Sequence, residues 1–421
     1  MRFIHAADIH LDSPLHGLSA YPDAPAEQLR NASREAFTLL VDQAIAEAVD
    51  FMVIAGDLYD GDWRDHNTGI FFVKEMGKLR RAGIPVYVVF GNHDAESEMS
   101  KRLLLPDNVH VFGSGKPQSF RIDRLKVALH GQSFKQKETL DNLAAGYPLP
   151  VPGHYNIGVL HTALEGNAAH ANYAPCSLAE LQAKGYAYWA LGHVHEFAHW
   201  PASGPGTADV VFPGNLQGRN IRETGRRGAV VVDVDADGHT RVERLFVDVL
   251  RWERLEVDAS GHPTLAEVVR DTGRRLEALL DEDAGVPRAV RVSVVGRSAA
   301  HGELFGRAAQ LRQEILAQIA AIGNERLWLE KVRVETAPAA LPQDAAAHPG
   351  ALAELSDIFA QAHQDPGFLE LLKNDLDALA AKAPLDLQAS TPVLQAIREG
   401  RLAELVQSVA PGLLGYLAQE E

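Results

Sequence analysis

The chain has 421 residues, which is too long for one ordinary domain, so we expect two or three folded units. Its composition, 46% hydrophobic and 23% charged residues, is that of a soluble globular protein, and the single cysteine, Cys176, excludes an internal disulfide framework. The net charge of −16 argues against a large basic surface for nucleic acid.

The acidic charge is unevenly distributed along the chain. Residues 336–421 contain 12 acidic and 4 basic side chains, so half of the net charge lies in the last fifth of the sequence. A surface that binds phosphate groups is therefore compatible with the other four fifths. No apolar run reaches 18 residues, and a strand-like pattern begins almost at the first residue, so we expect a cytoplasmic protein with neither a membrane span nor a signal peptide.

The first 250 residues alternate between strand-like and helix-like patterns. "RFIHAADIH" predicts a strand, residues 26–48 carry apolar residues at helical spacing, and "FMVIAGDLYD" predicts a second strand. The same alternation continues with a predicted helix over 68–82 and a predicted strand in "IPVYVVFGNHD". Further strand patterns follow with fewer helices between them: "KVALHGQSF", "YNIGVLHTAL", "YAYWALGHVHE", "DVVFPGN" and "GAVVVDVDADG". This order predicts an α/β domain over 1–250, with a sizeable mixed sheet between helices.

The pattern changes from about residue 251. "AVRVSVVG", a helix over 302–321 and "LWLEKVRVE" predict a small α+β domain over 251–336. "TAPAALPQDAAAHPGA" is rich in alanine and proline and predicts a linker. The region 337–421, which begins with this linker, is acidic and mostly helical in pattern. Prolines interrupt its helices at Pro366, Pro384, Pro392 and Pro411.

Polar clusters follow five of the strand patterns. They are Asp8 and His10 in "AADIH", Asp57 in "AGDLYD", Asn92, His93 and Asp94 in "FGNHD", His161 in "GVLHTA", and His193 and His195 in "LGHVHE". Side chains at the carboxyl ends of strands gather along one edge of an α/β sheet, where ligands bind. Each motif alone is a common turn or core feature, but all five in chain order are not expected by chance.

The residue types indicate a metal site. Asp, Asn and His without cysteine form a ligand set for Mn²⁺, Fe²⁺ or Zn²⁺. The candidate ligands are Asp8, His10, Asp57, Asn92, His161, His193 and His195. Seven ligands are too many for one ion, whereas two ions that share a carboxylate take four protein ligands each and keep positions open for substrate. Asp57 follows a central strand and is the natural bridge, and the neutral amide of Asn92 preserves positive charge for a phosphate ester.

These five motifs resemble those of the calcineurin-like metallophosphoesterases, and the resemblance covers roughly residues 1–230. Within that superfamily, "MRFIHAADIHLDSPL", "GDLYD", "PGNLQGR" and the C-terminal extension resemble the bacterial DNA-repair exonucleases, a group that includes SbcD-type nuclease subunits and YhaO-like proteins. The resemblance implies a β-sandwich flanked by helices, followed by a small α+β capping domain and a helical C-terminal region.

The resemblance also implies how the ligands divide between two metals. One ion would be held by Asp8, His10, Asp57 and His195, and the other by Asp57, Asn92, His161 and His193. His93 would contact the substrate phosphate as a general acid or transition-state stabiliser. Asp94 would orient a nearby imidazole from outside the metal shell. Mn²⁺ is the ion that the resemblance favours, while the ligand chemistry also permits Fe²⁺ or Zn²⁺.

Asp60 departs from the repair-nuclease pattern. The best-known repair nucleases carry histidine at this position, three residues after Asp57, whereas Asp60 restores the general superfamily motif. We expect Asp60 to hydrogen-bond a ligand histidine or a backbone group. The difference leaves open a small-molecule phosphodiesterase or phosphatase as an alternative function. A non-catalytic scaffold is disfavoured, because the ligands and His93 are all present.

Four arginines lie within nine residues beyond "FPGN". They are Arg219, Arg222, Arg226 and Arg227 in "NLQGRNIRETGRRGA". A guanidinium can bind a phosphate through two hydrogen bonds, so we predict DNA contacts here, with local pairing to Glu223 as the alternative. By analogy with the resembled group, the C-terminal helices would bind an ABC-type coiled-coil ATPase, and the chain could form a homodimer. The leading hypothesis is a manganese-dependent DNA exonuclease or endonuclease in DNA repair.

Overall fold

The computed structural model describes residues 1–11, 13, 26–60, 66–96, 103–165, 173–204, 206–281, 285–322, 326–339, 351–382 and 392–417. The chain divides into two compact units. The first comprises residues 1–253 with 286–289, and the second comprises residues 254–285 with 290–421. The predicted division into three domains stays a prediction, and most of the Ala/Pro-rich linker lies outside the described residues.

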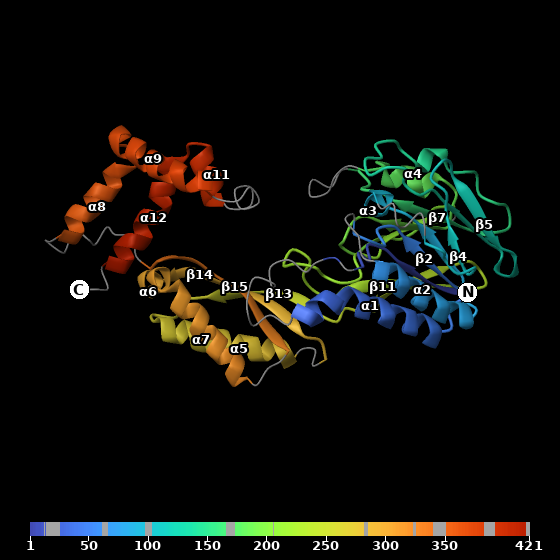
Figure 1. Ribbon diagram of the computed structural model, residues 1–421, viewed down its shortest axis with the longest axis horizontal. Coiled ribbons are helices and arrows are strands. Elements are labelled where there is room, and N and C mark those ends of the chain that lie inside the picture. The colour runs from blue at the N-terminus through green and yellow to red at the C-terminus, as the bar shows by residue number, and fades with distance from the viewer. Residues whose placement is uncertain are drawn as a thin grey trace. The chain divides into compact units, whose positions relative to one another are not determined.

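The first unit contains two six-stranded mixed sheets (Figure 1). The first sheet has the order β12-β11-β1-β2-β3-β4. Its strands are β1 (Arg2–Ala6), β2 (Phe51–Ala55), β3 (Val86–Val89), β4 (Val109–Val111), β11 (Gly228–Val234) and β12 (Thr240–Phe246). Strands β1 to β4 run parallel, and β11 pairs antiparallel with both β1 and β12.

The second sheet has the order β5-β6-β7-β8-β10-β9. Its strands are β5 (Gln118–Ile122), β6 (Val127–Gly131), β7 (Tyr155–His161), β8 (Tyr188–Gly192), β9 (Ala198–Trp200) and β10 (Asp209–Phe212). The four central strands run parallel, and the edge strands β5 and β9 are antiparallel to their neighbours.

Helices cover the outer faces of both sheets. The helical segments of this unit are α1 (Ala26–Ala46), α2 (His66–Arg81), α3 (Asn92–Glu96), α4 (Leu178–Ala183) and the 3₁₀ turns Asp123–Leu125 and Ala144–Gly146. Helices α1 and α2 lie side by side along the first sheet (Figure 1) and share its outer apolar cluster. Helix α4 packs on the second sheet, where Trp189 Nε1 donates a hydrogen bond of 2.8 Å to Leu181 O.

Alternation along the strands explains this layering. In β2, Phe51 and Val53 face the second sheet and pack in the same cluster as Ile157 of β7, whereas Met52 and Ile54 face the helices. The structure confirms the predicted α/β class, with a β-sandwich flanked by helices. The strand pattern alone predicted one mixed sheet, and this was wrong, because period-two burial does not specify which of two stacked sheets a strand joins.

The second unit is built on a three-stranded sheet of order β13-β14-β15. The strands are β13 (Arg251–Asp258), β14 (Arg288–Ser298) and β15 (Leu327–Pro338), with helices α5 (Leu265–Asp281), α6 (His301–Gly306) and α7 (Ala308–Ala321) between them. The first residues of β13 and β14 belong to the first unit. The helix predicted over 302–321 is divided at Arg307 into α6 and α7, and α5 and α7 pack on the sheet through one apolar cluster.

The C-terminal region is helical, as predicted. Its helices are α8 (Ala351–Ala362), α9 (Pro366–Lys382), α11 (Pro392–Arg398) and α12 (Leu402–Leu417). Pro366 and Pro392 begin helices, which suits a residue without a backbone N–H. Pro384 lies outside the described residues, and Pro411 lies within α12 instead of ending it. No helix in the described part of the chain is both long and apolar enough to span a membrane.

Gly158 of β7 provides a test of the second sheet's packing. A Cβ atom at this position would lie 2.3 Å from Cε3 of the buried Trp189 on β8. We predict that Gly158→Ala lowers the free energy of unfolding by about 1–3 kcal/mol, because an extra methyl group overpacks this contact. Urea denaturation measures the change. Gly115→Ala, whose added Cβ has no atom within 4 Å, is the matched control. An unchanged unfolding midpoint for Gly158→Ala would contradict the predicted strain.

Candidate metal centre

The seven predicted ligands converge at one edge of the sandwich. Each follows or ends a parallel strand: Asp8 and His10 after β1, Asp57 after β2, Asn92 after β3, His161 at the end of β7, and His193 and His195 after β8. Three of these strands belong to the first sheet and two to the second. The site is therefore formed where the carboxyl ends of both sheets meet.

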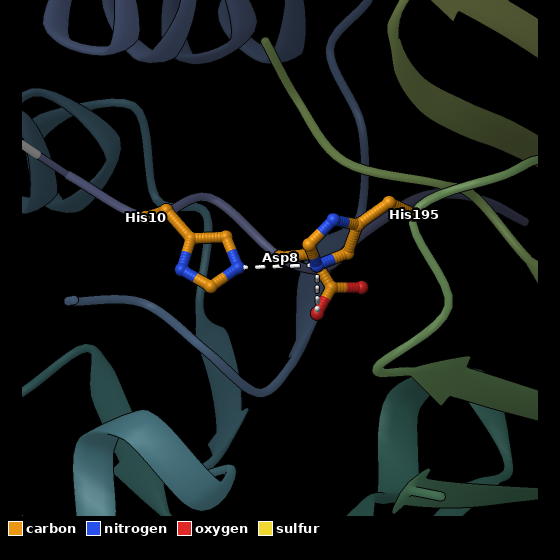
Figure 2. A group of neighbouring side chains, drawn as sticks. All are labelled: Asp8, His10 and His195. Atoms are coloured by element: carbon orange, nitrogen blue, oxygen red, sulfur yellow. Dashed lines mark hydrogen bonds and ion pairs between the residues drawn. The ribbon is translucent and has the colours of Figure 1, made fainter. Parts of the chain in front are cut away.

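The ligands form two groups with atoms close enough to share an ion. The first group is Asp8, His10 and His195, and the second is Asp57, His161 and His193, with the potential ligand atoms of each group within 4.8 Å of one another. Figure 2 shows the first group, in which His195 Nε2 lies 3.3 Å from His10 Nε2 and 4.0 Å from Asp8 Oδ1. These groups contain six of the seven predicted ligands; Asn92 belongs to neither, and Asp57, which the resemblance assigns to both ions, lies in the second group.

Two of the imidazoles are held by hydrogen bonds on their outer side. His161 Nδ1 donates to the backbone oxygen of Ala55 at 2.9 Å, and His195 Nδ1 donates to Glu223 Oε1 at 2.8 Å. In a neutral imidazole the other nitrogen then carries a lone pair. Each Nε2 atom would therefore present a lone pair to the centre of the site whenever its imidazole is neutral.

The Nε2 atom of a neutral His161 would face other acceptors. His161 Nε2 lies 3.0 Å from Asn92 Oδ1 and 3.4 Å from Asp57 Oδ2. An acceptor that faces two oxygen acceptors is repelled unless a proton or a cation lies between them. The arrangement of donor atoms in this group therefore fits a bound cation.

In the first group, His195 Nε2 lies 3.3 Å from the Nε2 atom of His10, and one proton on either nitrogen would join the two imidazoles. His10 Nδ1 is buried without a hydrogen-bond partner among the described residues, and its 3.6 Å separation from Asp60 Oδ1 is too long for one. Asp, Asn and His ligands in two adjoining groups fit two divalent cations of the Mn²⁺, Fe²⁺ or Zn²⁺ type.

Burial and neighbouring charges shift the pKa values of the site's side chains in opposite directions. Burial raises the pKa of Asp8 to about 6. Burial also favours protonation of Asp57, but the adjacent His161 outweighs it and holds the pKa of Asp57 well below its ordinary value. Burial lowers the pKa of His161, yet the Asp57 carboxylate outweighs that effect and raises it to about 9. A cation that binds here would replace the proton that this buried pair retains.

The backbone at the site adopts conformations that most residues avoid. Eight described residues other than glycine have positive φ, and four of them are candidate ligands: Asp8 at 49°, His10 at 46°, Asp57 at 50° and His193 at 101°. Such conformations cost roughly 1–3 kcal/mol each and persist only where the surroundings fix them. The backbone N–H of His193 supplies one such restraint, because it donates to both carboxylate oxygens of Asp8 at 3.0 and 3.1 Å.

In three motifs a glycine precedes the ligand, and steric crowding explains why no larger residue is found there. A Cβ at Gly192 would lie 1.9 Å from the backbone oxygen of Ala55, and one at Gly56 would lie 2.3 Å from His161 Nδ1. At Gly91 it would lie 2.3 Å from Asp57 Oδ1. Side chains at these positions would occupy the space of the ligands or of the strand beside them.

His93 lies at the opening of the site, with its side chain 32% exposed. Its backbone N–H donates to Asp57 Oδ1 and its Nδ1 donates to Asp60 Oδ1, each at 3.0 Å. Burial lowers the pKa of His93, but Asp60 and Asp57 outweigh burial and raise it. Asp60 was expected to hydrogen-bond a ligand histidine or a backbone group, but its short contact is with His93, and the ligand His10 is farther away.

Asp94 and Glu223 differ from what the sequence predicted. Asp94 was expected to orient an imidazole, but its carboxylate accepts the backbone N–H groups of Leu58, Tyr59 and Gly91 at 2.9–3.1 Å. It therefore joins the loops after β2 and β3. Glu223 was considered only as a partner for arginine, and its contact with His195 was missed because 28 residues separate them. The sequence could have predicted only that some acceptor exists, since a metal-binding imidazole needs one on its other nitrogen. It could not have identified which residue supplies it.

The four arginines have different environments. Arg227 is 4% exposed, and its guanidinium donates to His195 O, Asn215 Oδ1, Glu196 Oε1 and Thr224 O. This burial favours a structural role for Arg227 over the predicted DNA contact. Arg219 pairs with Glu223 at 3.1 Å beside the metal centre. Arg222 and Arg226 are exposed.

Known proteins similar to this chain are phosphoesterases. Residues 1–197 match the family of calcineurin-like phosphoesterases, and residues 252–337 match the family described as metallophosphoesterase YhaO, middle domain. The uncharacterized metallophosphoesterase YhaO of Bacillus subtilis is 35% identical over 302 residues, which are 70% of this chain and 72% of that protein.

More distant relatives carry a different name. The DNA double-strand break repair protein Mre11 of Methanopyrus kandleri is 27% identical over 314 residues, which are 68% of this chain and 65% of that protein. Among solved structures, a dimetal phosphatase from Danio rerio is 15% identical and aligns with a TM-score of 0.37, over 59% of this chain and 98% of its own.

The contact between Glu223 and His195 predicts a change in metal affinity. Glu223→Gln removes the charge that fixes the His195 imidazole, so we expect a 10- to 100-fold weaker affinity for Mn²⁺. Calorimetric titration with Mn²⁺ measures it. Glu243→Gln, on the exposed strand β12, is the control and should bind Mn²⁺ normally. Equal affinities in Glu223→Gln and the unmodified chain would show that this carboxylate does not support a metal ligand.

Proposed function

Because the chain belongs to the calcineurin-like phosphoesterase family, we propose that it is a dimetal-dependent DNA nuclease that hydrolyses phosphodiester bonds in DNA repair. The supporting observation is the pair of ligand groups around Asp57, with His93 at the opening of the site. A relative that is 27% identical is named a DNA double-strand break repair protein, which favours DNA as the substrate.

The proposed metal ions are two Mn²⁺. Asp8, His10 and His195 would hold one, His161, His193 and Asn92 the other, and Asp57 lies where it could serve both. Two divalent ions would supply a water-derived nucleophile at neutral pH and positive charge for the phosphate oxygens. The remaining steps depend on side chains of the chain itself.

His93 is the proposed proton donor. Its Nδ1 is held by Asp60, so the Nε2 of a protonated imidazole can give its proton to the oxygen that leaves phosphorus. The exposed fraction of its side chain allows a phosphate to reach it. Asp60 does not contact the substrate in this scheme, because its task is to position His93 and favour its charged form.

The contacts proposed for DNA are the arginines beside the site. Arg219 lies next to His195, and Arg222 and Arg226 are exposed in the following turn. We also propose, on the family resemblance alone, that the acidic C-terminal helices bind an ABC-type coiled-coil ATPase, that the chain forms a homodimer, and that it acts in the cytoplasm.

A small-molecule phosphodiesterase or phosphatase is the second candidate. Two observations favour it: the net charge of −16, which opposes binding to a polyanion, and Asp60 in place of the histidine that we expected for repair nucleases. Such an enzyme would use the same ligands and the same His93.

The proposed function predicts Mn²⁺-dependent cleavage of DNA that requires His93. We expect His93→Ala to lower the rate of cleavage of end-labelled single- and double-stranded DNA by about 10²- to 10⁴-fold. His239→Ala, at an exposed position in the turn between β11 and β12, is the matched control. A phosphodiester dye is assayed in parallel. Dye hydrolysis without DNA cleavage would favour the small-molecule enzyme and count against the nuclease.

Asp60 predicts a shift in the pH dependence of cleavage. The Asp60 carboxylate raises the pKa of His93, and the proposed acid works only while protonated, so activity falls as the pH rises through that pKa. We expect Asp60→Asn to lower this pKa and move the alkaline loss of kcat/KM to lower pH. Profiles of kcat/KM against pH measure the shift, with Asp237→Asn as an exposed control. An alkaline limb that stays in place would exclude this role for Asp60.

A further inference from the structure

Two aromatic rings and two guanidinium groups are stacked at the edge of the first sheet. The Cζ atom of Arg244 lies 4.8 Å from the ring centroid of Phe197 and 4.6 Å from that of Phe246. The Cζ atom of Arg226 lies 4.9 Å from the same Phe246 centroid. We call these four residues the Arg–Phe stack. Such contacts attract because the face of an aromatic ring is negative.

The strand register places the stack on the face of β12 that looks toward the second sheet, because Arg244 pairs with Val230, which belongs to the apolar cluster between the sheets. Arg244 and Phe246 are two residues apart on β12, so they share one face of that strand, and Arg241 and Glu243 point to the other. Strand β12 is the edge of its sheet, and Phe246 is 38% exposed. Arg244 is exposed as well, and its Nη2 donates to the backbone oxygen of Arg226 at 2.9 Å.

The stack adjoins the metal centre. Phe197 is two residues after the candidate ligand His195, so their Cα atoms are at most roughly 7 Å apart. Arg226 precedes Arg227, whose guanidinium donates to the backbone oxygen of His195 at 2.5 Å. The stack is thus joined to the site through two separate segments of the chain.

Its charge and geometry suit the backbone of a nucleic acid. Glu196, the acidic residue between His195 and Phe197, is paired with Arg227 at 2.7 Å, so the stack keeps a local positive charge on an otherwise acidic chain. Rings that cover the face of a guanidinium leave its N–H groups in the plane, where they can bind phosphate oxygens in pairs. The stacking also fixes the side chains before any ligand binds, which lowers the entropy lost on binding.

We propose that the Arg–Phe stack binds the sugar-phosphate backbone of the DNA strand a few nucleotides from the bond that is cleaved. The exposed edge of Phe246 adds an apolar contact for a sugar or base, as in other surfaces that bind single strands. This inference rests on the proposed nuclease function and extends it to residues that the arginine motif did not include, namely Arg244, Phe246 and Phe197.

Two substitutions in the stack and one control are tested through binding of a fluorescent single-stranded DNA oligonucleotide. They are made in the full-length His93→Ala chain with Mn²⁺ present, so that the DNA stays intact, and anisotropy gives the Kd at several salt concentrations. Arg244→Gln should raise the Kd about 10-fold and reduce the slope of log K against log salt by about 0.7, the loss of one phosphate contact. Phe246→Leu leaves the charge unchanged and should raise the Kd about 3- to 10-fold with the same slope.

Arg241→Gln is the matched control, because it removes an arginine from the opposite face of the same strand. Its Kd should stay within about twofold of the parent chain. The stack would be excluded if Arg244→Gln weakened binding no more than Arg241→Gln, or if Phe246→Leu bound like the parent. Thermal unfolding of each variant shows whether the fold is kept.

The unmodified chain separates failure of this inference from failure of the proposed function. If it hydrolyses the phosphodiester dye but neither binds nor cleaves DNA, the nuclease function fails and the stack fails with it. If it cleaves DNA and the Arg244→Gln variant binds DNA like its parent, only the stack is excluded.

Discussion

The close approach of the two sheets at Ala55 is the contact on which the site depends. The backbone oxygen of Ala55, at the end of β2, accepts a hydrogen bond from His161 of β7 and lies where a side chain at Gly192 of β8 would have to be. One peptide group of the first sheet therefore touches two strands of the second. Stacked sheets are ordinarily about 10 Å apart, so this backbone approach brings the ligands that follow β1 and β2 especially close to those of β7 and β8. Gly192 allows the close approach because it has no side chain, and the hydrogen bond from His161 to Ala55 stabilises it.

The electrostatics follow from that geometry. Carboxylates and imidazoles are brought together where water is excluded, so their unfavourable contacts are not relieved by solvent. Hydrogen bonds to Ala55 O and Glu223 Oε1 fix the outer nitrogens of His161 and His195, so their Nε2 atoms point into the interior, where His161 keeps a proton beside Asp57. Positive φ angles at four candidate ligands add strain to the same region. Buried charged groups and strained backbone, both unfavourable to folding, are therefore concentrated at this site. Bound cations would offset much of this unfavourable free energy.

The sequence predicted the parts of this site that depend on local order. Buried strands followed by Asp, Asn or His made the convergence of seven ligands predictable, because carboxyl ends of parallel strands share an edge. It did not predict the role of Glu223, the backbone contacts of Asp94 or the burial of Arg227, since each depends on contacts between distant segments. The strand pattern without the resemblance missed the second sheet for a related reason, as a buried strand has the same alternation in either layer. Arg244 and Phe246 form a stack with Phe197 only because a strand edge and a loop from another sheet meet.

Strand β1 has a consequence for the order in which the protein is made. It carries Asp8 and His10 at its end, and it pairs with β2 on one side and with β11 on the other. Its last partner, residues 228–234, leaves the ribosome more than two hundred residues after β1 itself, and Glu223 emerges only shortly before. At a synthesis rate of about 5–20 residues per second, the first ligands wait on the order of ten seconds or more for their neighbours. The full set of candidate ligands is therefore assembled late in biogenesis, after nearly the whole first unit has been translated.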